Sequence, residues 1–149
     1  MRMSLIVAAV ALSATFLAPG ALPSPSRAPA AVTVRSSDYG RILFDGRGFA
    51  LYAFTRDRTG HSACSHACAK AWPPFIITRR PRTGHGVKAP LLATTRRSDG
   101  RLQATYAGKP LYFYIGDRKP GQVLCQNVRE FGGLWLVVRK SGKPVPGSA

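Results

Sequence analysis

The chain contains two copies of one short pattern, sixty positions apart. The first copy runs from Leu51 to Asp57 and the second from Leu111 to Asp117. Each reads Leu-Tyr-x-aromatic-x-x-Asp and is followed by an arginine, and Trp72 falls near Trp135 once three residues are inserted. One hairpin-sized unit buries too little apolar surface to be stable alone, so we expect the two copies to build one shared core.

Glycine turns between short runs of strand-forming residues indicate a mainly β fold. The sequence predicts strands at 41–45, 49–55, 91–96, 102–106, 111–115 and 132–138. An alanine-rich stretch without β-branched residues predicts one short helix near residues 63–72, with Ser62 as its N-cap. We therefore expect an α+β fold, mainly β, in which two sequence repeats form a single small domain of antiparallel hairpins.

The two ends of the chain differ in composition from its centre. Residues 1–30 combine a basic start, an apolar stretch and small residues with prolines, which is the pattern of a secretory signal peptide. Cleavage is expected after Ala30 or, alternatively, after Gly20; an uncleaved N-terminal anchor is the competing interpretation. The remaining boundaries are a lead-in at 31–40, the duplicated domain at 41–139 and a tail at 140–149 that is expected to be disordered.

The expected location is outside the cytoplasm, and the expected charge there is strongly positive. No other stretch approaches the roughly 20 apolar residues that span a bilayer, so we expect a soluble secreted or envelope-associated protein. The chain carries 22 Lys and Arg against 6 Asp and Glu, and removal of residues 1–30 would leave a net charge of +14. Anionic envelope polymers and lipid headgroups are the expected partners, although a general coding bias toward arginine explains the composition equally well. No nucleic-acid recognition motif is present.

The repeated motif supplies aromatic and acidic side chains that have two interpretations. The aromatic residues could form a platform that stacks against sugars, but we favour core positions on paired strands. The two aspartates could act as acid and base in glycoside hydrolysis, but we favour acceptors of backbone N–H groups at turns. The motif residues are Tyr52, Phe54, Asp57, Tyr112, Tyr114 and Asp117.

A second constellation places two cysteines and two histidines within eight positions. These residues are His61, Cys64, His66 and Cys68, and such a set could hold Cu or Zn if the thiols were reduced. Export would place them in an oxidising compartment, which favours a Cys64–Cys68 disulfide and no bound cofactor. Cys125 makes the cysteine count odd and leaves three possible pairings.

Taken together, these motifs resemble the secreted repeat family of unknown function, also described as predicted lipoproteins with a conserved Tyr-x-(Phe/Trp/Tyr)-x-x-Asp motif. The resemblance covers roughly Arg41 to Val138. Besides both repeats it rests on the Cys64 to Pro74 segment and on Gly121 with Gln126 to Trp135. It implies an exported bacterial envelope protein without a known reaction, and it favours the short Cys64–Cys68 pair with Cys125 free.

One departure from the family and one absence shape the functional expectation. The chain has no Cys after the apolar stretch to accept a lipid, so we expect it to be released or held by charge. No hydrolase, metalloprotease, nucleotide or dinucleotide motif occurs. We therefore expect a nonenzymatic binding or structural module of unknown molecular activity, with a metal-binding or thiol-redox protein as the alternative.

Overall fold

Short strands make up most of the regular structure in residues 31–147, which are the residues that the computed structural model describes. One α-helix, α1 (Ala67–Ala71), and one 3-10 helix, η1 (Ala89–Leu91), accompany them. The strands are β1 (Ala31–Ser37), β2 (Gly40–Asp45), β3 (Tyr52–Phe54), β4 (Ile76–Ile77), β5 (Arg82–Thr83), β6 (Leu92–Arg96), β7 (Leu102–Tyr106), β8 (Lys109–Pro110), β9 (Val128–Glu130) and β10 (Gly133–Val137). The predicted mainly β fold with one short α-helix is confirmed. The predicted signal peptide at 1–30 lies outside the described residues.

The first hairpin is formed by β1 and β2, which pair antiparallel with Val34 opposite Leu43. The sequence analysis treated residues 31–40 as a lead-in and expected 41–45 to pair with 49–55. Instead the alternation of Val32 and Val34 places both side chains in the core. The expected hairpin is reduced to a bridge between Phe44 and Ala50.

The second hairpin, β6 with β7, repeats this arrangement about sixty residues later. Thr94 lies opposite Ala104, and β7 also pairs with β4 through Leu102 and Ile77. In the first repeat, the equivalent contact is the bridge between Ile42 and Arg139. The strand expected at 111–115 is absent from the described structure, because this segment makes only isolated bridges through Tyr112.

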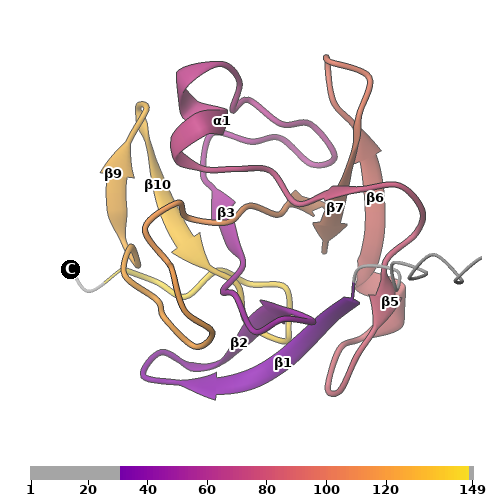
Figure 1. Ribbon diagram of the computed structural model, residues 1–149, viewed down its shortest axis with the longest axis vertical. Coiled ribbons are helices and arrows are strands. Elements are labelled where there is room, and N and C mark those ends of the chain that lie inside the picture. Colours follow the sequence, from indigo (N-terminus) through magenta and orange to yellow (C-terminus); the bar gives the residue numbers. More distant parts are fainter. Residues whose placement is uncertain (1–30, 148–149) are drawn as a thin grey trace, which may run out of the picture.

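The third sheet has the order β3, β10, β9 and joins the two repeats; in Figure 1 it runs from β3 near the centre of the molecule to β9 at the left edge. All three residues of β3 are buried, as the apolar character of both faces predicts. On one side Phe54 pairs with Trp135 of β10. On the other side Tyr52 bridges Tyr112, so each repeat supplies an edge for the other.

The backbone contacts between the repeats are reciprocal, as an approximate twofold axis through the Tyr52–Tyr112 bridge requires. The N–H of Tyr52 donates to the carbonyl of Tyr112 at 2.9 Å, and the reverse bond is 3.0 Å long. The same exchange recurs farther out in the pairs Gly60 to Gly108, 2.7 Å, and Gly121 to Gly48, 2.8 Å. The sequence duplication is therefore also a duplication of structure, and the two copies share one core.

The helix is shorter than its composition suggests. α1 begins after His66, and no side chain caps its N-terminus. Ser62, the expected N-cap, lies outside the helix, where its hydroxyl accepts a hydrogen bond from the Cys64 N–H at 3.3 Å and one from Arg97 Nη1 at 2.8 Å. The hydroxyl of Ser62 is thus bonded to the buried Arg97 side chain and does not provide the helix cap that the local sequence predicts.

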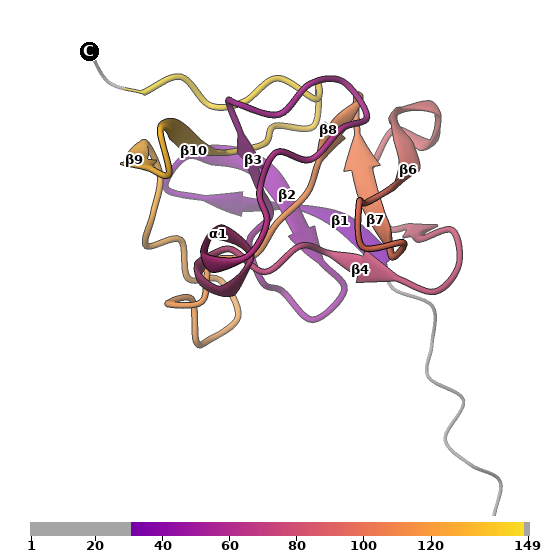
Figure 2. The ribbon, with the colours of Figure 1, turned by 90° about the horizontal axis from the view of Figure 1, so that it is seen from above.

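The C-terminal segment packs against the domain as far as it is described. Val145 is buried, and its N–H donates to the Val137 carbonyl at 2.8 Å. Figure 2 shows this segment running along the side of the molecule on which β8 lies. The expected disorder of residues 140–149 is therefore wrong for residues up to 147, because one apolar side chain and a short bridge between Val138 and Pro144 fasten the segment.

We expect Val145→Ala to lower the free energy of unfolding by about 1–3 kcal/mol, because the change removes buried methyl groups from a packed site. Urea unfolding followed by tryptophan fluorescence would measure this. Lys143→Ala, at an exposed neighbour, should change stability by less than about 0.5 kcal/mol. Equal stability of the Val145 variant and the unmodified protein would show that the segment is not part of the fold.

Candidate functional site

The repeated Tyr and Asp side chains are exchanged between the two repeats. The Tyr52 hydroxyl donates to Asp117 Oδ2 at 2.7 Å, and the Tyr112 hydroxyl donates to Asp57 Oδ2 at 2.8 Å. Both tyrosines are fully buried. The motif is therefore completed only when both repeats are present, because each phenol finds its acceptor in the other repeat.

The second oxygen of each carboxylate orders the loop that follows it. Asp57 Oδ1 accepts the Ala63 N–H at 2.7 Å, and Asp117 Oδ1 accepts the Leu124 N–H at 3.0 Å. The sequence analysis favoured aspartates that accept backbone N–H groups, and this is the geometry found. Both oxygens of each aspartate are thus engaged in holding the fold together.

Burial changes the acid–base properties of these groups. Desolvation raises the pKa of both tyrosines, with the neighbouring carboxylate adding to the effect. Desolvation also raises the pKa of Asp117 and raises the pKa of Asp57 to about 6, against the opposing hydrogen bonds from Ala63 and Tyr112. Tyr52 and Tyr112 therefore remain protonated donors at neutral pH.

Four aromatic rings stack alternately from the two repeats. Trp72 and Trp135 lie face to face with ring centroids 4.0 Å apart. Phe54 stacks on the outer face of Trp135 at 4.2 Å, and Tyr114 lies against Trp72 at 4.7 Å. Trp72, Trp135 and Phe54 are buried and Tyr114 is half-buried. These rings pack against one another as core residues. This is the arrangement that the sequence analysis favoured over a ligand-stacking platform.

The two tryptophans differ in their polar contacts. Trp72 Nε1 donates to Glu130 Oε2 at 2.7 Å. The equivalent nitrogen of Trp135 is buried and has no acceptor among the described residues. The stack is therefore symmetric in its rings but not in its hydrogen bonds.

Cys64 and Cys68 form a disulfide with their Cα atoms 5.3 Å apart. His61 and His66, the other members of the candidate metal set, are both exposed. Within residues 31–147 no group of three His, Cys, Asp or Glu side chains is arranged to hold a metal ion. The disulfide bond engages the sulfur atoms of both cysteines, whereas the alternative Cu or Zn site requires these sulfurs in the reduced form.

Cys125 is buried and has no disulfide partner. Because Ala63 and Leu124 donate equivalent hydrogen bonds, the residues that follow them, Cys64 and Cys125, occupy equivalent positions in the two repeats. Burial raises the pKa of the Cys125 thiol. The sequence held a signal for this correspondence, because Cys64 and Cys125 are sixty-one residues apart. The comparison of the repeated motifs alone did not use that signal.

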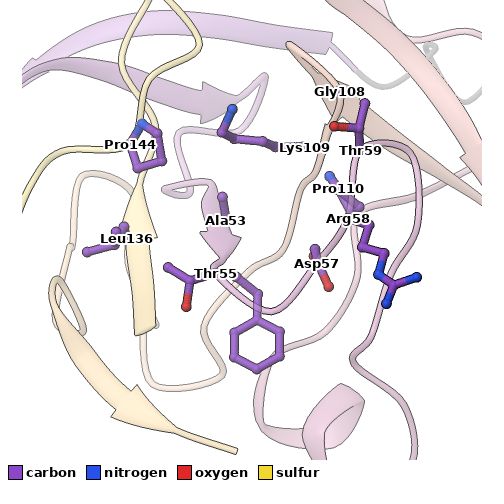
Figure 3. Close-up of a pocket in the computed structure, with 11 residues that line it drawn as sticks. Ala53, Thr55, Asp57, Arg58, Thr59, Gly108, Lys109, Pro110, Leu136 and Pro144 are labelled. Carbon is purple, nitrogen blue, oxygen red and sulfur yellow. The ribbon is translucent and has the colours of Figure 1, made fainter. Parts of the chain in front are cut away.

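A pocket of about 240 Å³ opens between the two repeats next to Asp57. In Figure 3, Leu136 and Pro144 lie on one side of it, and Asp57 and Pro110 lie on the other. Lys109 is at the upper rim of this view. The complete lining is Ala53, Phe54, Thr55, Asp57, Arg58, Thr59, Gly108, Lys109, Pro110, Leu136 and Pro144. Of these residues the sequence analysis had singled out only Phe54 and Asp57.

A second, shallow depression is lined mainly by basic side chains. Its lining residues are Tyr39, Gly40, Arg41, Lys88, Arg139, Lys140 and Ser141. They come from three separate parts of the chain, and none of them is acidic. The total charge of the sequence indicated a basic surface, but these four cations converge only in the folded chain.

Comparison with known proteins identifies one family. A family model described as "Secreted repeat of unknown function" matches residues 33–75 and 93–139. These two segments coincide with the two structural repeats and together cover more than half of the chain. No curated protein and no solved structure matches the chain. Within residues 31–147 no helix has the length and apolar character needed to cross a membrane.

We expect Tyr52→Phe to lower the free energy of unfolding by about 1–3 kcal/mol, because buried Asp117 loses the donor to one of its oxygens. Tyr39→Phe is the matched control, since Tyr39 is 37% exposed and should be nearly neutral. Urea unfolding of both variants would test this. A Tyr52 variant as stable as the Tyr39 variant would contradict the structural role of the exchange.

Asp57 should make the folded protein less stable as the pH rises, which is the opposite of the usual effect of an aspartate. Its pKa is about 6 in the folded chain and about 3.9 when unfolded, so the folded state retains the proton between these values. The contribution of Asp57 to the free energy of unfolding is therefore greatest below about pH 4, falls as the pH rises to about 6, and then levels off.

Unfolding of the unmodified protein and Asp57→Asn from pH 3.5 to 7.5 would measure this contribution as a difference in stability. Asp99→Asn is the control, because hydrogen bonds from Arg101 lower the pKa of exposed Asp99 to about 2. Its difference should stay constant between pH 4.5 and 7.5. A stability difference for Asp57→Asn that is flat or rises with pH would refute the raised pKa.

Proposed function

The chain belongs to the secreted repeat family of unknown function, and from this premise we propose that it is an exported, nonenzymatic module that binds anionic polymers of the cell envelope. The observation that carries the proposal is the depression around Arg41, Lys88, Arg139 and Lys140. Four cations around one hollow form a site to which phosphate or carboxylate groups are attracted.

The acidic residues do little to neutralise this surface. Five of the six accept hydrogen bonds within the fold, namely Asp45, Asp57, Asp99, Asp117 and Glu130. The ion pairs within residues 31–147 involve only Arg47, Arg97 and Arg101 among the basic residues. The other arginines and lysines of this part of the chain are therefore available to external anions.

The buried hydroxyl of Tyr106 holds two of the segments that line the depression. Tyr106 is fully buried, and its hydroxyl accepts the Lys88 N–H at 3.0 Å and donates to the Lys140 carbonyl at 2.9 Å. A third side is fixed by the bridge of Arg139 to Ile42, the residue after Arg41. The backbone of all four cations is thus ordered, which reduces the entropy lost on binding.

The chemistry of the depression suits a polymer that presents repeated anions. Guanidinium groups donate paired hydrogen bonds to phosphate and carboxylate oxygens, and ammonium groups add point charges. Tyr39, 37% exposed at the rim, offers a ring face to a sugar or glycerol unit of such a polymer.

Binding of inorganic polyphosphate to the mature protein, measured by calorimetry, tests the proposal. With about four phosphate contacts, the affinity should fall roughly tenfold to hundredfold between 50 and 200 mM salt. Arg41→Gln/Arg139→Gln should weaken binding at least about tenfold. The control Arg118→Gln/Arg129→Gln removes the same charge from exposed positions outside the depression and should have a much smaller effect.

Three outcomes would overturn the proposal. Equal losses in the two double variants would mean that charge attracts anions without a defined site. Absence of binding at low salt, or binding that salt does not weaken, would remove the electrostatic basis. Binding to phosphatidylglycerol vesicles without binding to polyphosphate would assign the surface to lipid headgroups instead of a polymer.

A further inference from the structure

We propose that the pocket between the repeats, shown in Figure 3, binds a compact organic monoanion with an apolar chain, such as a short fatty acid. The carboxylate would face Lys109, and the chain would lie against the apolar wall. This site is separate from the basic depression, because the two share no lining residue.

The lining combines an apolar wall with a charged rim. The apolar residues of the lining are Ala53, Phe54, Pro110, Leu136 and Pro144. Ligand sites in proteins are typically concave, mostly apolar and furnished with a few convergent polar groups. The volume of about 240 Å³ is below the roughly 300 Å³ at which sites for drug-sized ligands begin, so the ligand must be small.

The region related to this pocket by the approximate twofold axis is lined by different side chains. The sixty-residue offset equates Ala53 with Phe113 and Lys109 with Phe49. Thus the pocket is lined by a methyl group and a flexible cation where the other half has two phenylalanine rings. The twofold related contacts of Gly60 with Gly108 and Gly121 with Gly48 show that the backbones around these positions match.

In the symmetry-related region these two rings, Phe49 of the first repeat and Phe113 of the second, are used for internal packing. The Arg47 guanidinium lies over the Phe49 ring at 5.1 Å and over the Phe113 ring at 5.6 Å. Phe113 also packs against Phe75, with ring centroids 5.1 Å apart. Side chains of the protein thus fill the region that corresponds to the open space beside Ala53.

The charges of the pocket favour a monoanion. Lys109 and Arg58 are positive and Asp57 is the single acidic residue in the lining. Both oxygens of Asp57 already accept hydrogen bonds, from Ala63 and Tyr112, whereas neither Lys109 nor Arg58 has an acidic partner within residues 31–147. A ligand carboxylate that faces Lys109 would therefore meet a cation that lacks an internal counterion.

The pocket also adjoins the central aromatic stack. Phe54 is one of the residues that line the pocket, and its ring stacks on Trp135. A ligand seated here would change the surroundings of the ring next to a buried tryptophan. Tryptophan fluorescence therefore provides a second readout of binding, independent of the chemical shifts of the lining residues.

The test is an NMR titration of the mature protein with sodium octanoate at pH 7.5, using 1-octanol as the uncharged control. Saturable shifts should concentrate at the amides of Thr55, Thr59 and Gly108, and octanol should bind about tenfold more weakly or worse. Lys109→Gln should weaken octanoate binding about tenfold. Arg118→Gln, at the position equivalent to Arg58 in the other repeat, should leave it unchanged.

Ala53→Phe copies the other repeat into the pocket and should abolish binding. If this variant does not fold, the Lys109→Gln and octanol comparisons still decide the question. Absence of saturable octanoate binding would overturn the proposal, as would equal affinity for octanol. Shifts confined to Lys88 and Lys140 would also overturn it, because they would place the anion in the basic depression.

Discussion

The exchange of tyrosine and aspartate side chains between the repeats is the interaction on which the rest of the structure depends. Each buried phenol donates across the molecule at 2.7 or 2.8 Å, and each carboxylate then orders the loop that follows its own strand. The loop after Asp57 carries the disulfide, and the loop after Asp117 carries Cys125. Loss of either bond would therefore affect both repeats, because buried polar groups without partners are costly.

The two halves share their packing and differ in their surfaces. The stacked tryptophans, the exchanged hydrogen bonds and the paired glycine contacts are all duplicated. The pocket beside Ala53 has two phenylalanines at its counterpart positions, and the basic depression draws its cations from Arg41, Lys88 and the segment after β10. Duplication thus supplied a shared core, and the pocket and the basic depression lie where the two copies differ.

The sequence predicted the features that depend on local pattern and missed those that depend on contacts between distant residues. Strand-forming runs and glycine turns correctly indicated a mainly β fold. The export signal and the family resemblance favoured the Cys64–Cys68 disulfide, which the structure contains. The strand at 31–37 was missed because polar residues flank its two buried valines. Val145 gave no signal because one apolar residue in a Pro/Gly tail has no periodicity.

The candidate sites were harder to predict than the fold. The two repeats revealed Asp57 and Phe54, but the pocket also needs Lys109, Leu136 and Pro144, which belong to no motif. Likewise Tyr106 joins Lys88 to Lys140 across fifty-two positions of sequence. Local pattern carries no information about such convergence, because it follows from how the two hairpins pack.

The reciprocal Tyr52–Tyr112 bridge has a consequence for the ancestry of the fold. An interface in which residue i of one copy contacts residue j of the other, and the reverse, is the isologous geometry of a symmetric homodimer. Here that geometry lies within a single polypeptide. A lone copy has no acceptor for its tyrosine and no donor for its aspartate, so the smallest self-sufficient unit is a pair. The protein has the architecture of a fused dimer, whose linkage freed each half to acquire its own surface.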